Sequence, residues 1–252
     1  MMRTLLAKEW REQWRTWRGV ILVAVLVISG LISPLLAYYT PVLLRSVPGM
    51  PPGFADLIPD PTMADAIGQY LKNVSQFGVL LIVILSMGSV AQEIERGTAA
   101  MLLARPVRRS ALVLSKWLIW SAVLALGLAL SAFLDAVYTW ILFEPLPFLE
   151  FVQLNLLLFV FFNVFLSVSL LASSLARTQA VAAGAAFGGL ALLLVLGSLP
   201  RLGDFMPNKL NAWGVALMLG NPDSAWGALW VSLGIIVVAL AAACWRLERE
   251  EI

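Results

Sequence analysis

The residues that could do chemistry in this chain are few, and their types exclude the common catalytic sites. The sequence contains no histidine and one cysteine, Cys244. This excludes His-Glu-x-x-His metalloproteases, Ser-His-Asp hydrolases, and haem or zinc sites that need imidazole. None of the four lysines follows a glycine, so the chain lacks the Gly-Lys-Ser/Thr ending of a phosphate-binding loop. We therefore expect no catalytic site, no metal site and no cofactor in this chain.

The most informative polar run covers residues 92–109, inside an otherwise apolar body. A turn residue, a helix-capping residue and a helix terminator follow one another in it, namely Gly97, Thr98 and Pro106. Leu102 and Leu103 would give the short helix between them an apolar side. The cations Arg105, Arg108 and Arg109 cluster around its end. Two interpretations are equally open, a helix that docks into a groove of a partner and a basic loop that lies on lipid headgroups.

Two polar residues interrupt apolar runs and are candidates for helix packing or for a transport pathway. Asp135 lies in the outer third of a long run, where an acid is either functional or close enough to the headgroups to stay hydrated, and we favour the hydrated acid. Asn163 lies midway along the next run, where an interhelical hydrogen bond is favoured over substrate contact. Gly184 and Gly188 bring small residues four apart into the fifth run. They permit close helix packing, within one subunit or across a dimer interface.

The composition predicts an all-α, polytopic integral membrane protein formed by one transmembrane domain over residues 1–252. The chain is 61% hydrophobic and 13% charged, whereas soluble domains are about half apolar and about a quarter charged. Spans of about 20 residues fit six apolar runs. We expect transmembrane helices at 20–39, 74–90, 117–143, 151–176, 180–199 and 225–245. Outer loops are expected at 40–73, which is Pro-rich and holds a short helix at 62–72, and at 200–224.

Residues 1–18 are predicted to form an amphipathic helix in the membrane interface. Trp10, Trp14 and Trp17 recur on one helical face, and Arg11 and Arg15 lie on the adjoining face. Aromatic residues beside cations are typical of a helix that lies along lipid headgroups.

The distribution of cations predicts the orientation. With six spans, the first 18 residues, the 91–116 segment, the turn at 177–179 and the tail share one side, and they hold thirteen of the seventeen lysines and arginines. The positive-inside rule places both termini and the 91–116 segment in the cytosol of a multi-pass plasma-membrane protein. The net charge of +2 is too small to indicate nucleic acid as a partner.

The run Glu93-x-Glu95-Arg96-Gly97-Thr98, followed by Leu102-Leu103 and Pro106-Val107-x-Arg109, resembles the signature loop of type 2 ATP-binding cassette (ABC) permeases. In that family an E-x-E-x-G-T run, two leucines, a Pro-Val-x-Arg run and a later lysine join spans two and three. Lys116 stands where that lysine is expected. The Lys8-Glu9 pair and the turn that ends at Gln179 also resemble the family.

The resemblance implies a permease subunit of an ATP-driven transporter, with export favoured by analogy. The segment between spans two and three would be a cytosolic coupling helix that docks onto a separate ATPase subunit, which would bind ATP and Mg. Residues 1–18 would be an interfacial elbow that touches the same ATPase. A second permease subunit, identical or a paralogue, would complete the translocation path. The alternative is a stand-alone ion-coupled secondary transporter or channel, which usually needs intramembrane acids or cations.

Overall fold

The computed structural model describes residues 2–45, 60–95, 109–221 and 224–249 and is helical, with no strand in these ranges. Six helical stretches are long and apolar enough to cross a membrane, at 18–43, 63–95, 110–142, 148–175, 179–198 and 226–249. The predicted all-α fold with six candidate spans is therefore confirmed. Helices are the expected solution, because a lipid-exposed backbone must satisfy its hydrogen bonds within its own segment.

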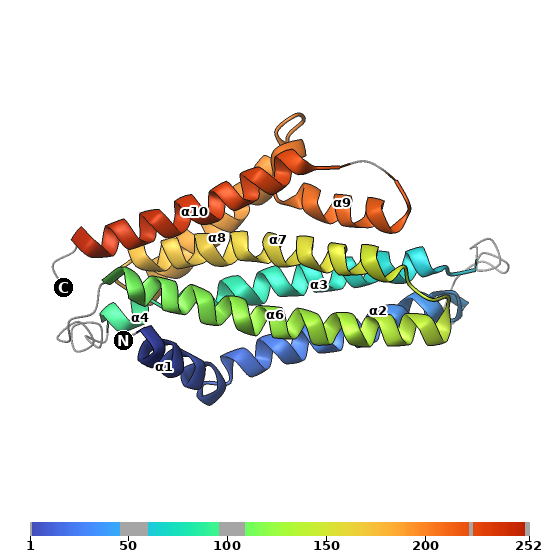
Figure 1. Ribbon diagram of the computed structural model, residues 1–252, viewed down its shortest axis with the longest axis horizontal. Coiled ribbons are helices and arrows are strands. Elements are labelled where there is room, and N and C mark those ends of the chain that lie inside the picture. Colours follow the sequence, from blue (N-terminus) through green and yellow to red (C-terminus); the bar gives the residue numbers. More distant parts are fainter. Residues whose placement is uncertain (1, 46–59, 96–108, 222–223, 250–252) are drawn as a thin grey trace.

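The helices form an elongated bundle in which α1, α4 and the C-terminal end of α10 lie at one end (Figure 1). We call this the near end, and the opposite end the far end. The elements are α1 (Met2–Arg15), α2 (Arg18–Arg45), α3 (Met63–Ser86), α4 (Ala91–Glu95), α6 (Arg109–Leu142), α7 (Phe148–Leu175), α8 (Gln179–Ser198), the 3₁₀ turn η2 (Gly203–Phe205), α9 (Asn208–Met218) and α10 (Trp226–Arg249).

Short polar and proline signals mark several helix boundaries. Thr62 and Asp65 form a capping box at the start of α3, where the Asp65 carboxylate accepts from the Thr62 backbone N–H and hydroxyl, both at 2.8 Å. Pro147 caps α7, and the Thr178 hydroxyl caps α8 by accepting from the Val181 N–H at 3.4 Å.

The structure differs from the sequence prediction in three places. The short helix at 62–72 and the span at 74–90 are one continuous helix, α3, because no proline or turn separates them and Asn73 is held by a hydrogen bond to Ser33. The predicted loop 200–224 contains a further helix, α9, which packs on α7. Helix α6 begins at Arg109, inside the segment predicted as a loop.

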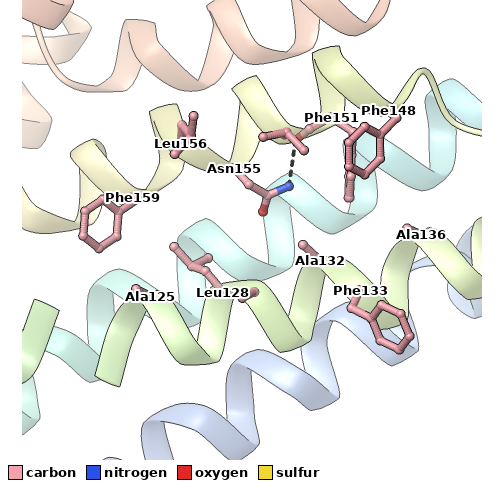
Figure 2. Close-up of a pocket in the computed structure, with 12 residues that line it drawn as sticks. Ala125, Leu128, Ala132, Phe133, Ala136, Phe148, Phe151, Asn155, Leu156 and Phe159 are labelled. Atoms are coloured by element: carbon pink, nitrogen blue, oxygen red, sulfur yellow. Dashed lines mark hydrogen bonds between the residues drawn. The ribbon is translucent and has the colours of Figure 1, made fainter. Parts of the chain in front are cut away.

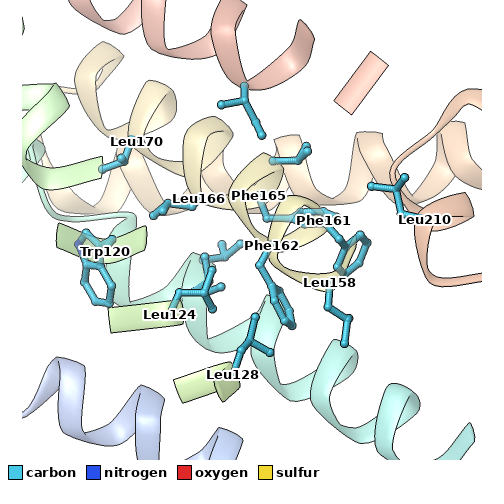
Figure 3. Packing of buried hydrophobic residues seen from close by; sticks show 14 of the residues in the cluster. Trp120, Leu124, Leu128, Leu158, Phe161, Phe162, Phe165, Leu166, Leu170 and Leu210 are labelled. Carbon is cyan, nitrogen blue, oxygen red and sulfur yellow. The ribbon is translucent and has the colours of Figure 1, made fainter. Parts of the chain in front are cut away.

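The apolar core lies where α6 and α7 meet. Trp120 and Leu124 of α6 pack beside Phe162 and Phe165 of α7, and all four side chains are buried (Figure 3). A side chain at Gly78 of α3 would collide with the Phe162 ring, at 2.5 Å, so this glycine permits close packing of α3 on α7. Helix α7 is the most buried of the six spans and α8 the least, which makes α7 the central helix and α8 a peripheral one.

A sharp turn joins α1 to α2 and lets α1 leave the direction of the spans (Figure 1). Trp17 adopts φ of 63° there, a left-handed conformation that is uncommon for a bulky residue. The chain returns to a helix at once, since the Ile21 N–H donates to the Trp17 carbonyl at 2.8 Å.

Candidate functional site: an ion cluster at the near end

Four charged side chains meet at the near end of the bundle and form what we call the ion cluster, namely Lys8, Glu9, Glu93 and Lys116. Lys116 Nζ donates to both oxygens of Glu9, at 3.1 Å each, and to Glu93 Oε1 at 3.0 Å. Lys8 Nζ donates to Glu93 Oε1 at 2.6 Å and to Glu9 Oε1 at 3.1 Å. The cluster therefore ties α1 and α4 to α6.

The ion cluster is largely removed from water, and its charges balance. The Lys116 side chain is 2% exposed, those of Glu9 and Glu93 are 4% and 11% exposed, and that of Lys8 is 36% exposed. Burial alone would lower the pKa of Lys8, but the hydrogen bond to Glu93 and the charges of Glu9 and Glu93 outweigh it and raise the pKa above its ordinary value. Lys8 is thus held in its charged form.

A second set of polar contacts joins the start of the 92–109 run to α2 and α8. Gln92 accepts from Arg18 at 2.9 Å and donates to the Gln179 side chain at 2.7 Å. The backbone N–H of Gln179 donates to Glu95 Oε2 at 3.1 Å. The two acids of the Glu-x-Glu motif therefore have different roles, since Glu93 faces the ion cluster and Glu95 faces the start of α8.

The turn before α4 is anchored to the central helix. The Ser173 hydroxyl of α7 accepts from the backbone N–H groups of Val90 and Ala91, at 3.0 Å each. The Ser89 hydroxyl accepts from the Trp120 indole at 3.3 Å. Buried backbone donors need such partners, so these contacts hold the point at which α3 gives way to α4.

In this cluster the two lysine ammonium groups would compete with a metal ion for the carboxylate oxygens. Carboxylate oxygens of Glu9, Glu12 and Glu93 lie within 4.8 Å of one another, which is close enough to share an ion. The ammonium groups of Lys8 and Lys116 already contact the oxygens of Glu9 and Glu93, and Lys8 also lies 3.6 Å from Glu12. The arrangement is that of an ion-pair network.

Part of the predicted coupling segment lies outside the described residues. These residues are Arg96, Gly97, Thr98, Leu102, Leu103, Arg105, Pro106 and Arg108. Arg109 is described as the first residue of α6. At one end of the segment Glu95 contacts the start of α8, and at the other end Arg109 begins α6, about two helical turns before Lys116.

The helix predicted for residues 1–18 is present as α1, and it packs on the bundle through a face other than its tryptophan face. Leu5, Glu9 and Gln13 face the bundle, whereas Trp10 and Trp17 are exposed and Trp14 is half-buried beside Trp10. Arg11 and Arg15 are exposed. Leu5, Glu9 and Gln13 are four residues apart and therefore share one face of the helix, and this spacing could have indicated the face that packs on the bundle.

The four residues proposed for packing or a pathway lie apart from the ion cluster. Asn163 accepts from Ser121 at 2.6 Å and donates to the Phe159 carbonyl at 2.9 Å, which joins α7 to α6. Gly184 and Gly188 are exposed, and a side chain at either would meet nothing within 4 Å. They do not serve packing against the described part of the chain.

Asp135 is fully buried, and this corrects the prediction of a hydrated acid near the headgroups. Its depth along α6 agrees with that prediction, but the side chain turns into the bundle. Beside it, α6 and α7 border an apolar groove of about 490 Å³, lined mainly by alanine, leucine and phenylalanine (Figure 2). Asn155 is the polar residue of its lining and accepts from the Tyr70 hydroxyl at 2.7 Å.

Comparison with known proteins identifies the family of this chain. The sequence profile described as ABC-2 family transporter protein matches residues 3–212, a range that includes the whole ion cluster. The chain is also 28% identical to YxlG of Bacillus subtilis (strain 168), described as an uncharacterized transmembrane protein. The alignment spans 255 residues, with 100% of this chain and 98% of the relative. The match of the profile to most of the chain means that this protein is a member of the ABC-2 family of membrane transporter proteins.

Proposed function

We propose that this chain is the permease subunit of an ABC exporter and that the ion cluster transmits the movement of a separate ATPase subunit to the membrane spans. The permease part of such transporters carries no ATPase of its own, so the partner would bind ATP and Mg. The observation that carries the proposal is the set of contacts from Lys116 to Glu9 and Glu93, because they join three helices at the base of the 96–108 segment.

Polar contacts of three residues anchor this base to the surrounding helices. Glu93 is bound to α1 and α6, Gln92 to α2 and α8, and Glu95 to α8. A force applied to residues 96–108 would therefore reach four helices at once. The buried ion pairs resist separation of α1, α4 and α6, since a charge left without its partner in a low-dielectric site is costly. These helices would then move as one unit when the ATPase subunits close.

Within the segment we assign roles by residue type. Gly97 and Thr98 would turn the chain and cap a short coupling helix, and Leu102 and Leu103 would dock into the ATPase. Arg105, Arg108 and Arg109 would contact acidic groups of the partner or lipid phosphates.

The position of the coupling segment also indicates which end of the bundle faces the cytosol. The near end collects α1, α4 and the C-terminal end of α10, and ATP is supplied in the cytosol (Figure 1). We therefore place both termini and the ion cluster on the cytosolic side of the plasma membrane. Trp10 and Trp17, exposed on α1, would then lie among the lipid headgroups.

A second permease subunit, a copy of this chain or a paralogue, would pack against the exposed face of α8. Gly184 and Gly188 open that face to a close approach, since a side chain added at either would meet no described residue within 4 Å.

The proposal is tested by purifying the full chain from its native membrane in mild detergent and identifying bound proteins by mass spectrometry. We expect an ATP-binding cassette subunit to copurify with the natural chain and to be lost from the Leu102→Asp/Leu103→Asp variant. The matched control is Lys209→Glu, which changes an exposed residue of α9, outside the coupling segment. Stimulated ATP hydrolysis by the reconstituted pair is the second measurement.

Two results would contradict the proposal. One is the absence of any ATPase from the natural chain under all solubilisation conditions, which would favour a stand-alone ion-coupled transporter or channel. The other is equal recovery of the ATPase with the natural chain and with the leucine variant, which would move the docking site elsewhere.

A further inference from the structure

A layer of polar side chains crosses the bundle toward its far end, away from the ion cluster. It contains Ser33 of α2, Tyr70 and Asn73 of α3, Ser131, Asp135 and Thr139 of α6, and Asn155 of α7. Such a layer within membrane-spanning helices is costly unless its members satisfy one another or bind something.

The donors that Ser33, Tyr70, Asn73 and Asn155 bring to this layer already have acceptors. The Tyr70 hydroxyl donates to Asn155 Oδ1 at 2.7 Å, and the Asn155 amide donates to the Phe151 carbonyl at 2.9 Å. The Asn73 amide donates to Ser33 Oγ at 3.0 Å, and Ser33 donates to the Ser29 carbonyl at 2.6 Å. None of these donors is directed to a carboxylate.

The other polar oxygens of this layer lie along one face of α6. Both oxygens of Asp135 and Thr139 Oγ1 are buried and have no hydrogen-bond partner among the described residues, and the buried Ser131 Oγ lies beside the Tyr70 hydroxyl. All three side chains are 0% exposed. Positions 131, 135 and 139 are four apart, so they project from the same side of the helix. The carboxylate therefore stands between two hydroxyl groups on α6.

The neighbouring helix α2 offers a further oxygen, the carbonyl of Gly30, at the level of Ser131. Helix α2 lies close to α6 at Gly30, where a side chain would collide with Ser131. Pro34 has no N–H, so the carbonyl of Gly30 receives no helical hydrogen bond from the residue four positions later.

We infer that Asp135, with the hydroxyl groups of Ser131 and Thr139, forms a binding site for one monovalent cation, a proton or a sodium ion. A carboxylate that is fully buried and accepts no hydrogen bond needs a compensating positive charge. The described part of the protein offers no lysine or arginine to Asp135, so the charge must come from outside. Oxygen atoms of a carboxylate and of hydroxyls suit a hard cation, and a proton would equally satisfy them by converting one oxygen into a donor.

The titratable groups near this site are few. Tyr70 of α3 interacts electrostatically with Asp135, and its hydroxyl donates to Asn155 in the groove wall. The charged residues of α1 and α10 lie toward the near end. Among the side chains that the structure describes, the other titratable groups toward the far ends of α2, α3, α6 and α7 are exposed or half-buried, namely Tyr38, Tyr39, Asp65, Lys72, Tyr138 and Glu150.

The test uses the purified full chain in lipid nanodiscs, without an ATPase, so its outcome does not depend on the proposed coupling function. Infrared spectroscopy measures the band of a protonated carboxyl group as the pH is raised. In parallel, thermal unfolding is measured in sodium chloride and in choline chloride at equal ionic strength. The variants are Asp135→Asn and Thr139→Val, with the exposed Asp60→Asn as the matched control.

If the ligand is a proton, the natural chain will show a protonated carboxyl band that disappears with rising pH and is absent from Asp135→Asn. If the ligand is sodium, sodium but not choline will raise the unfolding temperature, and Asp135→Asn will lose this effect. Thr139→Val should weaken binding of the proton or sodium ion by about tenfold, because it removes one oxygen contact to a charged group. Asp60→Asn should behave as the natural chain.

The inference is overturned if the natural chain shows neither a protonated carboxyl band nor a response to sodium. It is equally overturned if Asp135→Asn retains the response of the natural chain. The titrations of the natural chain decide the question by themselves if a variant fails to fold.

Discussion

Replacing Lys116 by methionine is the most direct test of the ion cluster. Methionine keeps the approximate length of the side chain but removes its charge and its three hydrogen bonds to Glu9 and Glu93. Among the described residues, Lys8 would then be the cation that remains in contact with two carboxylates that are 4% and 11% exposed. We expect the free energy of unfolding to fall.

The magnitude follows from the burial of the pair. Breaking a buried ion pair by removing one partner typically costs about 3–5 kcal/mol, because the other charge remains buried. Lys8 still donates to both carboxylates, so we expect the lower end of this range, about 3 kcal/mol. The same change at Lys209 breaks an exposed pair with Asp204 and should cost at most about 1 kcal/mol.

The assay is unfolding of the full chain by a denaturing detergent in mixed micelles, followed by circular dichroism. The triple variant Lys116→Met/Glu9→Gln/Glu93→Gln removes the carboxylates left without their partner and should recover most of the loss. The reasoning is refuted if Lys116→Met is as stable as Lys209→Met, or if the triple variant is no more stable than the single one.

Three further predictions concern other contacts of the bundle. Ser173→Ala removes the acceptor of two buried backbone N–H groups before α4 and should destabilise the protein by about 1–3 kcal/mol, whereas Ser198→Ala, at an exposed helix end, should be nearly neutral in the same unfolding assay. Gly30→Ala forces α2 away from Ser131 and should cost about 1–3 kcal/mol; unchanged stability would show that the two helices separate freely. The raised pKa of Lys8 means that its stabilising charge is fully present below the unfolded-state pKa of about 10.4 and is lost only as the pH rises further. Lys8→Met should therefore leave any pH dependence of stability between about pH 6 and 9 unchanged, and a loss of that dependence would contradict the assignment.

The number of spans and the family could be predicted from the sequence because both depend on local information. Apolar runs of sufficient length must become helices in lipid, whatever their neighbours, since the backbone has no other source of hydrogen bonds there. The run from Glu93 to Arg109 is likewise contiguous. Helix boundaries were less accurate, and α9 was missed, because a short helix on the surface of a bundle is stabilised by packing on α7 and not by its own sequence.

The ion cluster and the buried acid depend on which faces of the helices meet, and a periodic pattern does not specify this. Glu9 and Lys116 are separated by 107 positions, and Lys8 and Glu93 by 85, so no local spacing relates them. Asp135 illustrates the same limit. Its position in the sequence determines its depth along α6, whereas the packing of α2, α3 and α7 decides that its carboxylate is removed from water. Depth follows from helical rise alone, but burial and charge pairing arise only when distant segments of the chain come into contact.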